Sequence, residues 1–186
     1  MDWELEVKKR PAFGENIIVN TSAVSVGKPS FHCYRNFELF DENNELFATA
    51  TSKWVLFDSK NEKITKVDSD IMKLFNTEGN PEEAEAKLTK LREPDSYEEV
   101  LEYKVKRSDI DVNMHMNNLN YLKLAYEALP EELFFDEELN HLRIMYKHQI
   151  KLNDEVKCFY SKQNDGVYVT IKSKNQKVLH AIVKLW

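Results

Sequence analysis

The stretch Asp109-Ile-Asp111-Val-Asn113-Met-His115-Met-Asn117-Asn118 carries most of the information about fold and function in this chain. Asp111, Asn113 and His115 occur at every second residue, so an extended backbone would place their side chains on one side of the segment. The residues expected on the other side are Val112, Met114 and Met116. A carboxylate, an amide and an imidazole together can hold, orient and deprotonate a water molecule.

A second interpretation is that these polar side chains only form loop and helix-cap hydrogen bonds. The residues that follow favour a catalytic role over this second interpretation. The spacing of Leu119, Leu122 and Tyr126 predicts a helix that ends near Pro130 and buries one stripe. Asn117 or Asn118 is placed to cap this helix. Its first N–H groups and its positive dipole end would then lie beside the triplet and stabilise charge on a carbonyl oxygen.

The rest of the chain is predicted to be mainly strands. Residues 2–75 are predicted to form an antiparallel meander, with turns at Gly27-Lys28-Pro29 and at residues 41–44. Asn80, Pro81 and Glu83 predict a surface helix over 81–92, with its charged residues forming a solvated face. Further strands are expected around 101–105, 142–150, 155–163, 167–173 and 177–186.

The two halves of the chain look like copies of one unit. Residues 3–10 align with 142–149 and residues 46–54 align with 178–186, with turns at matching places. The counterparts of the strand and helix at 100–130 would fall before Met1, so we expect the first copy to lack them and the chain to begin inside a longer ancestral sequence or to be a fragment. The predicted domains are a first, incomplete unit at 1–75, a linker helix region at 76–96 and a second unit with the polar motif at 97–186.

Composition narrows the function classes. The chain has 26 Lys plus Arg against 32 Asp plus Glu, a net charge of −6, which argues against a nucleic-acid binder that relies on overall basic charge. Neither a signal peptide nor an apolar run long enough for a membrane helix is found in the sequence, so we expect a cytoplasmic protein without membrane contact. Cys33 and Cys158 stand far apart and the histidines lack ligand spacing, so no metal site is expected.

Residues 107–122, Arg107-Ser-Asp-Ile-Asp-Val-Asn-Met-His-Met-Asn-Asn-Leu-Asn-Tyr-Leu122, resemble the motif that opens the second hot-dog domain of acyl-ACP thioesterases. Lys9-Arg-Pro-Ala-Phe-Gly14 and Ala48-Thr-Ala-Thr-Ser-Lys-Trp-Val-Leu56 are similar to the first domain of that family. The resemblance covers nearly the whole chain. It implies an α+β, tandem (double) hot-dog fold, in which each antiparallel sheet normally wraps around a long helix and the first unit here lacks that helix.

The resemblance implies catalytic roles for four residues. Asp111, Asn113 and His115 fall on the catalytic positions of the family, where Asn113 and His115 would polarise the thioester or the water and Asp111 would orient the group. The fourth position is a Glu in the family and Gln149 here, and Gln cannot accept the proton that a carboxylate accepts. Gln149 would orient a water and leave proton transfer to Asp111 or His115. Ile150 replaces the cysteine that follows in plant members, which excludes a Cys–His–Asn mechanism there.

The implied activity is hydrolysis of fatty acyl-ACP to free fatty acid and ACP, by direct attack of water and without a cofactor, in fatty acid biosynthesis. Substrate contacts are expected from Asn117, Asn118, Tyr121 and Trp54. The basic groups at 104–107 and 143–151 are predicted either to form a patch for acidic acyl carrier protein or for the phosphates of CoA, or to be a solvated strand face.

Two alternatives stay open at the level of sequence: acyl-CoA hydrolysis, and a weakly active or inactive hot-dog protein that binds acyl groups. Gln149 and the missing first helix motivate the second alternative. A sheet without its helix leaves an apolar face that another chain commonly covers, so we also expect a homo-oligomer.

Overall fold

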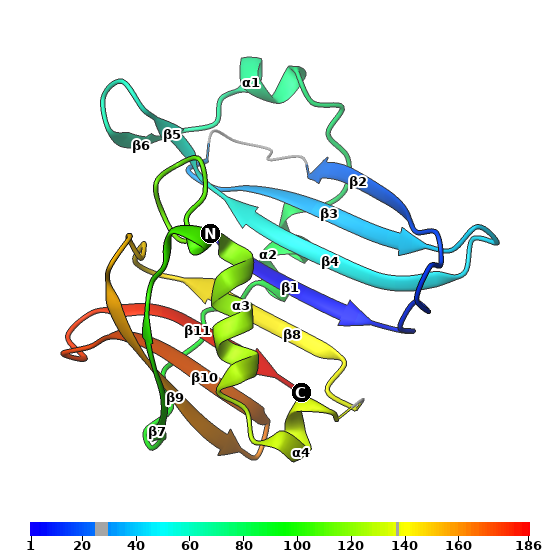
Figure 1. Cartoon of the computed structure of the whole chain (residues 1–186). Coiled ribbons are helices and arrows are strands. Elements are labelled where there is room, and N and C mark those ends of the chain that lie inside the picture. The colour runs from blue at the N-terminus through cyan, green and yellow to red at the C-terminus, as the bar shows by residue number, and fades with distance from the viewer. Residues whose placement is uncertain (25–29, 137) are drawn as a thin grey trace. The chain divides into compact units, whose positions relative to one another are not determined.

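The computed structural model of the chain describes residues 1–24, 30–136 and 138–186, which fold into two compact units, Met1–Thr89 and Lys90–Trp186 (Figure 1). Each unit is an antiparallel sheet with helices. The predicted turn at Gly27-Lys28-Pro29 lies outside the described residues. The predicted domain boundaries at 75 and 96 stay predictions.

The sheet of the first unit has the strand order β2-β3-β4-β1. The bounds of its main strands are β1 Asp2–Val7, β2 Ile18–Val24, β3 Cys33–Phe40 and β4 Leu46–Trp54. The predicted meander is therefore correct for β2 to β4 only, because β1 pairs with β4, from Asp2 opposite Lys53 to Val7 opposite Ala48. The connection 8–17 is longer than a hairpin turn, so β1 and β2 need not be neighbours.

The two faces of this sheet differ in polarity. Residues opposite one another in the ladder share a face, so Leu5, Ala50 and Phe37 lie on one face, and Asn36 and Thr51 lie on the other. On the apolar face Trp3 stacks on Phe37, with 5.0 Å between the ring centroids. The face that carries Asn36 is mainly polar, except at Val24 and Tyr34, which lie on the same face and are buried.

Short elements complete the first unit. Their bounds are β5 Leu56–Asp58, β6 Lys63–Thr65, α1 Ser69–Lys73 and α2 Pro81–Lys87. The prediction of strands throughout 2–75 is wrong at α1, where the side chain of Asp68 accepts hydrogen bonds from the N–H groups of Asp70 and Ile71 and so caps a helix. The strand β4 ends at Trp54, and the short strand β5 begins at Leu56.

Helix α2 is capped as predicted, since the side chain of Asn80 accepts a hydrogen bond from the N–H of Glu82 at 2.9 Å. The helix ends at Lys87 rather than at 92. Its description as a surface linker is incomplete, because Ala84 and Leu88 form a buried cluster with Val24 and Tyr34. The charged residues of α2 are exposed, as expected, while its apolar side packs on β3 and β4.

The sheet of the second unit has the order β8-β11-β10-β9-β7, and Figure 1 shows helix α3 lying across it. The elements are β7 Glu98–Lys104, a short 3-10 helix at Arg107–Asp109, α3 Asn118–Glu127, α4 Glu131–Phe134, β8 His141–Tyr146, β9 Glu155–Gln163, β10 Gly166–Ser173 and β11 Leu179–Leu185. Tyr121, Leu124 and Ala125 are the buried residues of α3, which contacts β10 and β11. The predicted helix with one buried stripe is confirmed, but the stripe is not the expected one, because Leu119 is 58% exposed and Leu122 and Tyr126 are half-buried.

The strand orders confirm the internal duplication. Counted in sequence order, β1, β2, β3 and β4 correspond to β8, β9, β10 and β11, and both sheets arrange these strands as first, fourth, third and second. Within the described part of the first unit, residues 1–24 and 30–89, there is no counterpart of β7 or α3. Across all described residues, none of the helices is both long enough and apolar enough to cross a membrane.

Candidate active site

The polar motif forms a tight turn between the 3-10 helix and α3. The N–H of Asp111 donates to the carbonyl of His115 at 2.9 Å, and the N–H of Met114 donates to the carbonyl of Asp111 at 3.0 Å. Ile110 and Met116 pair as an antiparallel bridge at the base of the turn. The expectation of an extended segment with alternating faces is therefore wrong.

The apolar residues of the motif show the consequence of this turn. Met116 is buried, whereas Val112 and Met114 are 96% and 68% exposed. Met114 has a φ of +62°, in the left-handed region that side-chain-bearing residues rarely adopt. Such strain persists only where surrounding contacts hold it, and it is concentrated at functional sites. The hydrogen bonds of the turn keep Met114 in this conformation.

Asp109, which the sequence reasoning did not single out, fixes the base of the turn. Its carboxylate accepts hydrogen bonds from the hydroxyl of Tyr103 at 2.8 Å and from the N–H of Lys106 at 2.7 Å. Its carbonyl accepts from the N–H of Asn117 at 2.7 Å and from the side-chain amide of Asn120 at 3.1 Å. The sequence did offer a signal for this role of Asp109. It stands three residues after Lys106, and an acid at that distance from a helix start accepts a hydrogen bond from the first N–H.

Asn117 is the residue that caps α3. Its side-chain oxygen accepts from the N–H of Leu119 at 2.9 Å, and its carbonyl accepts from the N–H of Asn120 at 2.9 Å. These two N–H groups are thus engaged, contrary to the expectation that the helix start would offer its free N–H groups to a substrate. The positive end of the helix dipole still lies at the turn. The predicted substrate contact of Asn117 stays a prediction.

The segment that contains Gln149 lies against the turn. The N–H of Met116 donates to the carbonyl of Ile150 at 2.8 Å, and the N–H of Ile150 donates to the hydroxyl oxygen of Tyr121 at 3.0 Å. Met116 follows His115 and Ile150 follows Gln149 in the chain. The fold therefore brings the backbone beside Gln149 next to the motif, although the two segments are distant in sequence.

Two tyrosines, the buried Tyr121 and the half-buried Tyr146, support this arrangement. The rings of Tyr121 and Tyr146 meet edge to face with centroids 5.2 Å apart, and the hydroxyl of Tyr146 donates to the carbonyl of Asn118 at 3.1 Å. Burial raises the pKa of Tyr121 to about 12 and also raises the pKa of Tyr146. Both phenols are neutral near pH 7, so they can donate hydrogen bonds without adding charge.

The four predicted catalytic side chains remain open to water. Asp111 accepts a hydrogen bond from the N–H of Asn113 at 2.8 Å. Among the residues that the structure describes, the side chains of Asn113, His115 and Gln149 have no hydrogen-bond partner. Asp111 and His115 are half-buried, and Asn113 and Gln149 are exposed. The site thus presents an imidazole, a carboxylate and two amides to solvent at one end of α3.

In the described part of the chain, neither Cys158 nor the metal-binding side chains form a second centre. Burial raises the pKa of the Cys158 thiol to about 12, so it is not the thiolate that nucleophilic chemistry needs. Within 1–24, 30–136 and 138–186, the His, Cys, Asp and Glu side chains form no group of three that is placed to hold a metal ion.

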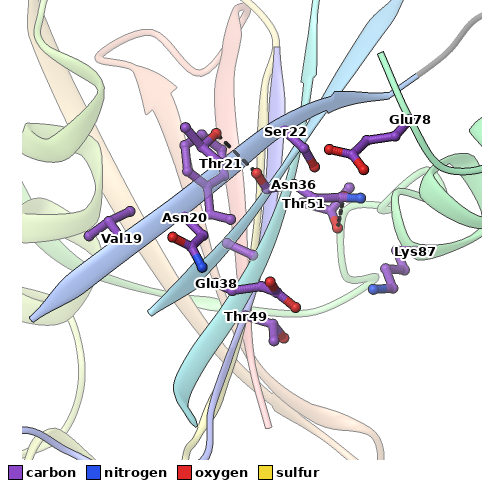
Figure 2. A pocket seen from close by; sticks show the side chains of 12 residues that line it. Val19, Asn20, Thr21, Ser22, Asn36, Glu38, Thr49, Thr51, Glu78 and Lys87 are labelled. Atoms are coloured by element: carbon purple, nitrogen blue, oxygen red, sulfur yellow. Dashed lines mark hydrogen bonds between the residues drawn. The ribbon is translucent and has the colours of Figure 1, made fainter. Parts of the chain in front are cut away.

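Two hollows in the described part of the first unit differ in polarity. A cavity of about 310 Å³ is lined mainly by apolar side chains, among them Trp54, Ile71, Met72 and Phe75. A larger one of about 720 Å³ lies over the polar face of the sheet, where Asn20, Ser22, Asn36, Glu38 and Thr51 gather (Figure 2). An apolar ligand suits the smaller of these two hollows. Trp54, a predicted substrate contact, lies there, with its indole N–H donating to the hydroxyl of Ser52 at 2.6 Å.

The fold and the capped turn at the start of α3 define a hot-dog protein with two repeated units. The N-terminal domain model of the acyl-ACP thioesterases matches residues 1–75, and the C-terminal domain model matches residues 92–185. The chain belongs to the acyl-ACP thioesterase family.

Individual relatives agree with this assignment. The chain is 28% identical over 165 residues to an oleoyl-acyl carrier protein thioesterase of Arabidopsis thaliana, and the match covers 82% of this chain and 44% of that relative. This chain thus spans less than half the length of that relative. Two solved structures share its fold. An acyl-ACP thioesterase from Bacteroides thetaiotaomicron superposes with a TM-score of 0.76 and 19% identity, over 99% of this chain and 73% of that one. A 12:0-ACP thioesterase from Umbellularia californica superposes with a TM-score of 0.78 and 17% identity, over 99% and 72%.

Proposed function

We propose that the chain hydrolyses fatty acyl thioesters carried on acyl carrier protein, releasing the fatty acid by attack of water at the turn 111–115. The observation that supports this most directly is the turn itself: it holds Asp111, Asn113 and His115 open to solvent at the start of α3. The family model that matches residues 92–185 includes this turn. Relatives of this family are named as oleoyl- and palmitoyl-acyl carrier protein thioesterases.

The four side chains have different roles in this reaction. The carboxylate of Asp111 and the imidazole of His115 are the groups able to accept a proton from the attacking water. The amides of Asn113 and Gln149 can orient that water or donate to the thioester carbonyl, but neither can take its proton. The positive end of the α3 dipole favours the negative charge that develops on the carbonyl oxygen. No cofactor is needed for this step.

A purified-chain assay tests the proposal. Release of the carrier thiol from acyl-ACP is followed with a thiol reagent for the wild type, His115→Ala and Asp111→Asn. Each variant is expected to lose about 100-fold or more in turnover, because general acid–base catalysis is worth that much. Asn164→Ala, at an exposed hairpin turn of the same unit, is the control and is expected to keep full activity. Unchanged turnover in His115→Ala with an intact fold would show that these roles are wrong.

Gln149 supports a second candidate function, acyl binding with little or no hydrolysis. The resemblance implies a carboxylate at this position, and the exposed amide of Gln149 cannot serve as a base. Gln149→Glu distinguishes the two functions. If the chain is a slow or inactive binder, this variant is expected to gain turnover by about tenfold or more. If Asp111 or His115 already serves as the base, Gln149→Glu is expected to change the rate little. Matched acyl-CoA and acyl-ACP substrates separate the two carriers.

A further inference from the structure

The long strands β2 and β7 each pair with one neighbour only in the described part of the chain, and their open edges differ in charge. Of the seven residues of β7, Glu98–Lys104, four are charged. β2 has no charged residue, and the sequence is uncharged from Asn16 to Val24. Charged side chains are one of the devices that keep an edge strand from pairing with another chain. The edge of β7 has this protection and the edge of β2 lacks it.

The side chains at the start of β2 are exposed although they are apolar. Ile17, Ile18 and Val19 are 41%, 44% and 55% exposed. β-branched residues of this kind fit the pleated surface of a sheet. An exposed, uncharged edge strand built from them is a template on which an extended chain can pair.

A hydrogen bond near the end of β2 shows which of its backbone groups point to the open edge. The N–H of Glu78 donates to the carbonyl of Ala23 at 2.9 Å, and because β3 occupies one side of β2, this bond lies on the other side. Alternate residues of a strand direct their N–H and C=O groups to the same side. The backbone groups of Val19 and Thr21 therefore also point to the open edge, where none of the described strands pairs with them.

The polar hollow of about 720 Å³ runs along the same edge (Figure 2). Four consecutive residues of β2, Val19–Ser22, line it. Two carboxylates line it as well: Glu38, which lies opposite Asn20 in the ladder, and Glu78 at the end of the open edge. Both are exposed, and neither forms an ion pair with the residues that the structure describes. Lys87 is the one cation among the lining residues, so the hollow carries a net negative charge.

We propose that the open edge of β2 binds an extended peptide segment of another protein as an added strand, with Lys or Arg side chains of that segment facing Glu38 and Glu78. Backbone hydrogen bonds to Val19 and Thr21 supply the affinity, and the hollow selects the side chains. This binding does not require the proposed hydrolysis.

The geometry of an added strand brings basic side chains within reach of the two carboxylates. Every second side chain of such a strand lies over the polar face of the sheet. Its backbone would be about 10 Å from that of β3, two strand spacings away, a gap that a Lys or Arg side chain and Glu38 can bridge together. A second copy of β2 would bring no charge to these acids, whereas the net charge of −6 of the chain attracts a basic partner.

Titration with two matched peptides tests the charge selection. The probe is a fluorescein-labelled peptide in which Lys and Val alternate, and the control peptide has Glu in place of each Lys. The full chain is expected to bind the Lys peptide about tenfold more tightly than the Glu peptide at low salt. Equal binding of the two peptides would overturn the selection by Glu38 and Glu78.

Charge variants of the protein locate this selection. Glu38→Gln combined with Glu78→Gln is expected to raise the dissociation constant of the Lys peptide about fivefold. Glu131→Gln combined with Glu132→Gln, on the exposed face of α4, makes the same change in net charge and is expected to stay within about twofold. Equal weakening by the two double variants would overturn the proposed site.

Backbone changes test the added strand itself. Val19→Pro removes an N–H that points to the open edge, where Pro is tolerated, and is expected to weaken binding about fivefold or more. Two N-methylated Lys peptides leave the protein unchanged: methyl groups on one alternate set of amides face β2 and abolish binding, and those on the other set face solvent and preserve it. Binding that both methylated peptides retain would overturn strand addition.

Hydrogen–deuterium exchange identifies the occupant of the edge. The Lys peptide is expected to slow exchange of the amides of Val19 and Thr21 and to leave that of Ser22, which faces β3, unchanged. Protection of Val19 and Thr21 that grows with the concentration of the chain alone would identify a second copy as the occupant and overturn the proposal.

Discussion

The two sheets share one strand order but differ in what covers them. In the second unit, α3 lies across the sheet, and Val169, Ile171 and Val183 are 0% exposed. In the first unit the helices are short, and Ile18 and Val19 of β2 are 44% and 55% exposed. Equal topology therefore does not give equal burial, because a sheet excludes water from a face only where another layer packs on it.

The candidate site lies in the unit with the long helix. The contacts that pack this helix on the sheet also position the site. The hydroxyl of Tyr121, on the buried side of α3, accepts from Ile150 beside Gln149, while Asn117 at the start of α3 bonds to Asp109 below the turn. The helix that fills the sheet thus also positions the polar turn. Four predictions test this comparison.

The largest difference is expected from truncating a leucine in each unit. Leu124→Ala in α3 is expected to lower the free energy of unfolding of the second unit by about 2–5 kcal/mol, through lost burial and a cavity. Leu88→Ala, beside α2, is expected to cost about 2 kcal/mol in the first unit, because its cluster is small. Hydrogen–deuterium exchange of peptides from each unit measures both effects. Equal losses would show that the long helix is not what distinguishes the units.

Asp109→Ala is expected to lower both the stability of the second unit and the rate of hydrolysis. The substitution leaves the hydroxyl of Tyr103 and the N–H of Lys106 without their acceptor, at a cost of about 2–3 kcal/mol. Hydrolysis is expected to fall about tenfold or more as the turn loses its support. Urea unfolding and the acyl-ACP assay measure the two effects.

Two further variants serve as controls for Asp109→Ala. Tyr103→Phe removes one of the two bonds and should show a smaller effect. Asp95→Ala, at an exposed position, should show none. Full activity in Asp109→Ala would argue against a positioning role.

The same substitution in both sheets compares their faces directly. Val169→Thr places a hydroxyl in a fully buried position and is expected to cost about 1–3 kcal/mol. Val19→Thr changes a side chain that is 55% exposed and is expected to stay within about 0.5 kcal/mol. Thermal melts of the two variants give the difference. A large cost for Val19→Thr would reveal that β2 is covered in solution, as the predicted homo-oligomer requires.

The smallest effect concerns the buried His180 of the second unit. Burial lowers the pKa of its imidazole, whose Nδ1 lies 3.0 Å from the carbonyl of His148, with the charges of Asp154 and His148 acting in opposite directions. The unfolded chain therefore binds a proton at a pH where the folded chain does not. Stability is expected to fall as the pH drops from 7 towards 5, by no more than about 1.4 kcal/mol per pH unit. Urea unfolding at three pH values measures this slope, which His180→Gln should reduce. Equal slopes in both proteins would contradict the prediction.

Sequence patterns predicted the regular elements more reliably than the irregular ones. The strand expected at 155–163 matches β9 and the strand expected at 167–173 matches β10, because strand periodicity is a local property. Helix α1 was not predicted because it is only 5 residues long, and so few residues show no helical period. The extended form expected for 111–115 was wrong because hydrogen bonds to His115 and Ile150 and the left-handed Met114 reverse the chain there, and alternation alone carries no information about them.

The sequence by itself determined the family, the repeated strand pattern, the cap of α3 and the identity of the polar triplet, since each depends on residue types at short spacing. Only the tertiary structure decided that β1 pairs with β4, that Asp109 anchors the turn, and that the segment with Gln149 lies against it. These features join segments far apart in the chain, and which of them meet is decided by sheet pairing and burial in the folded protein.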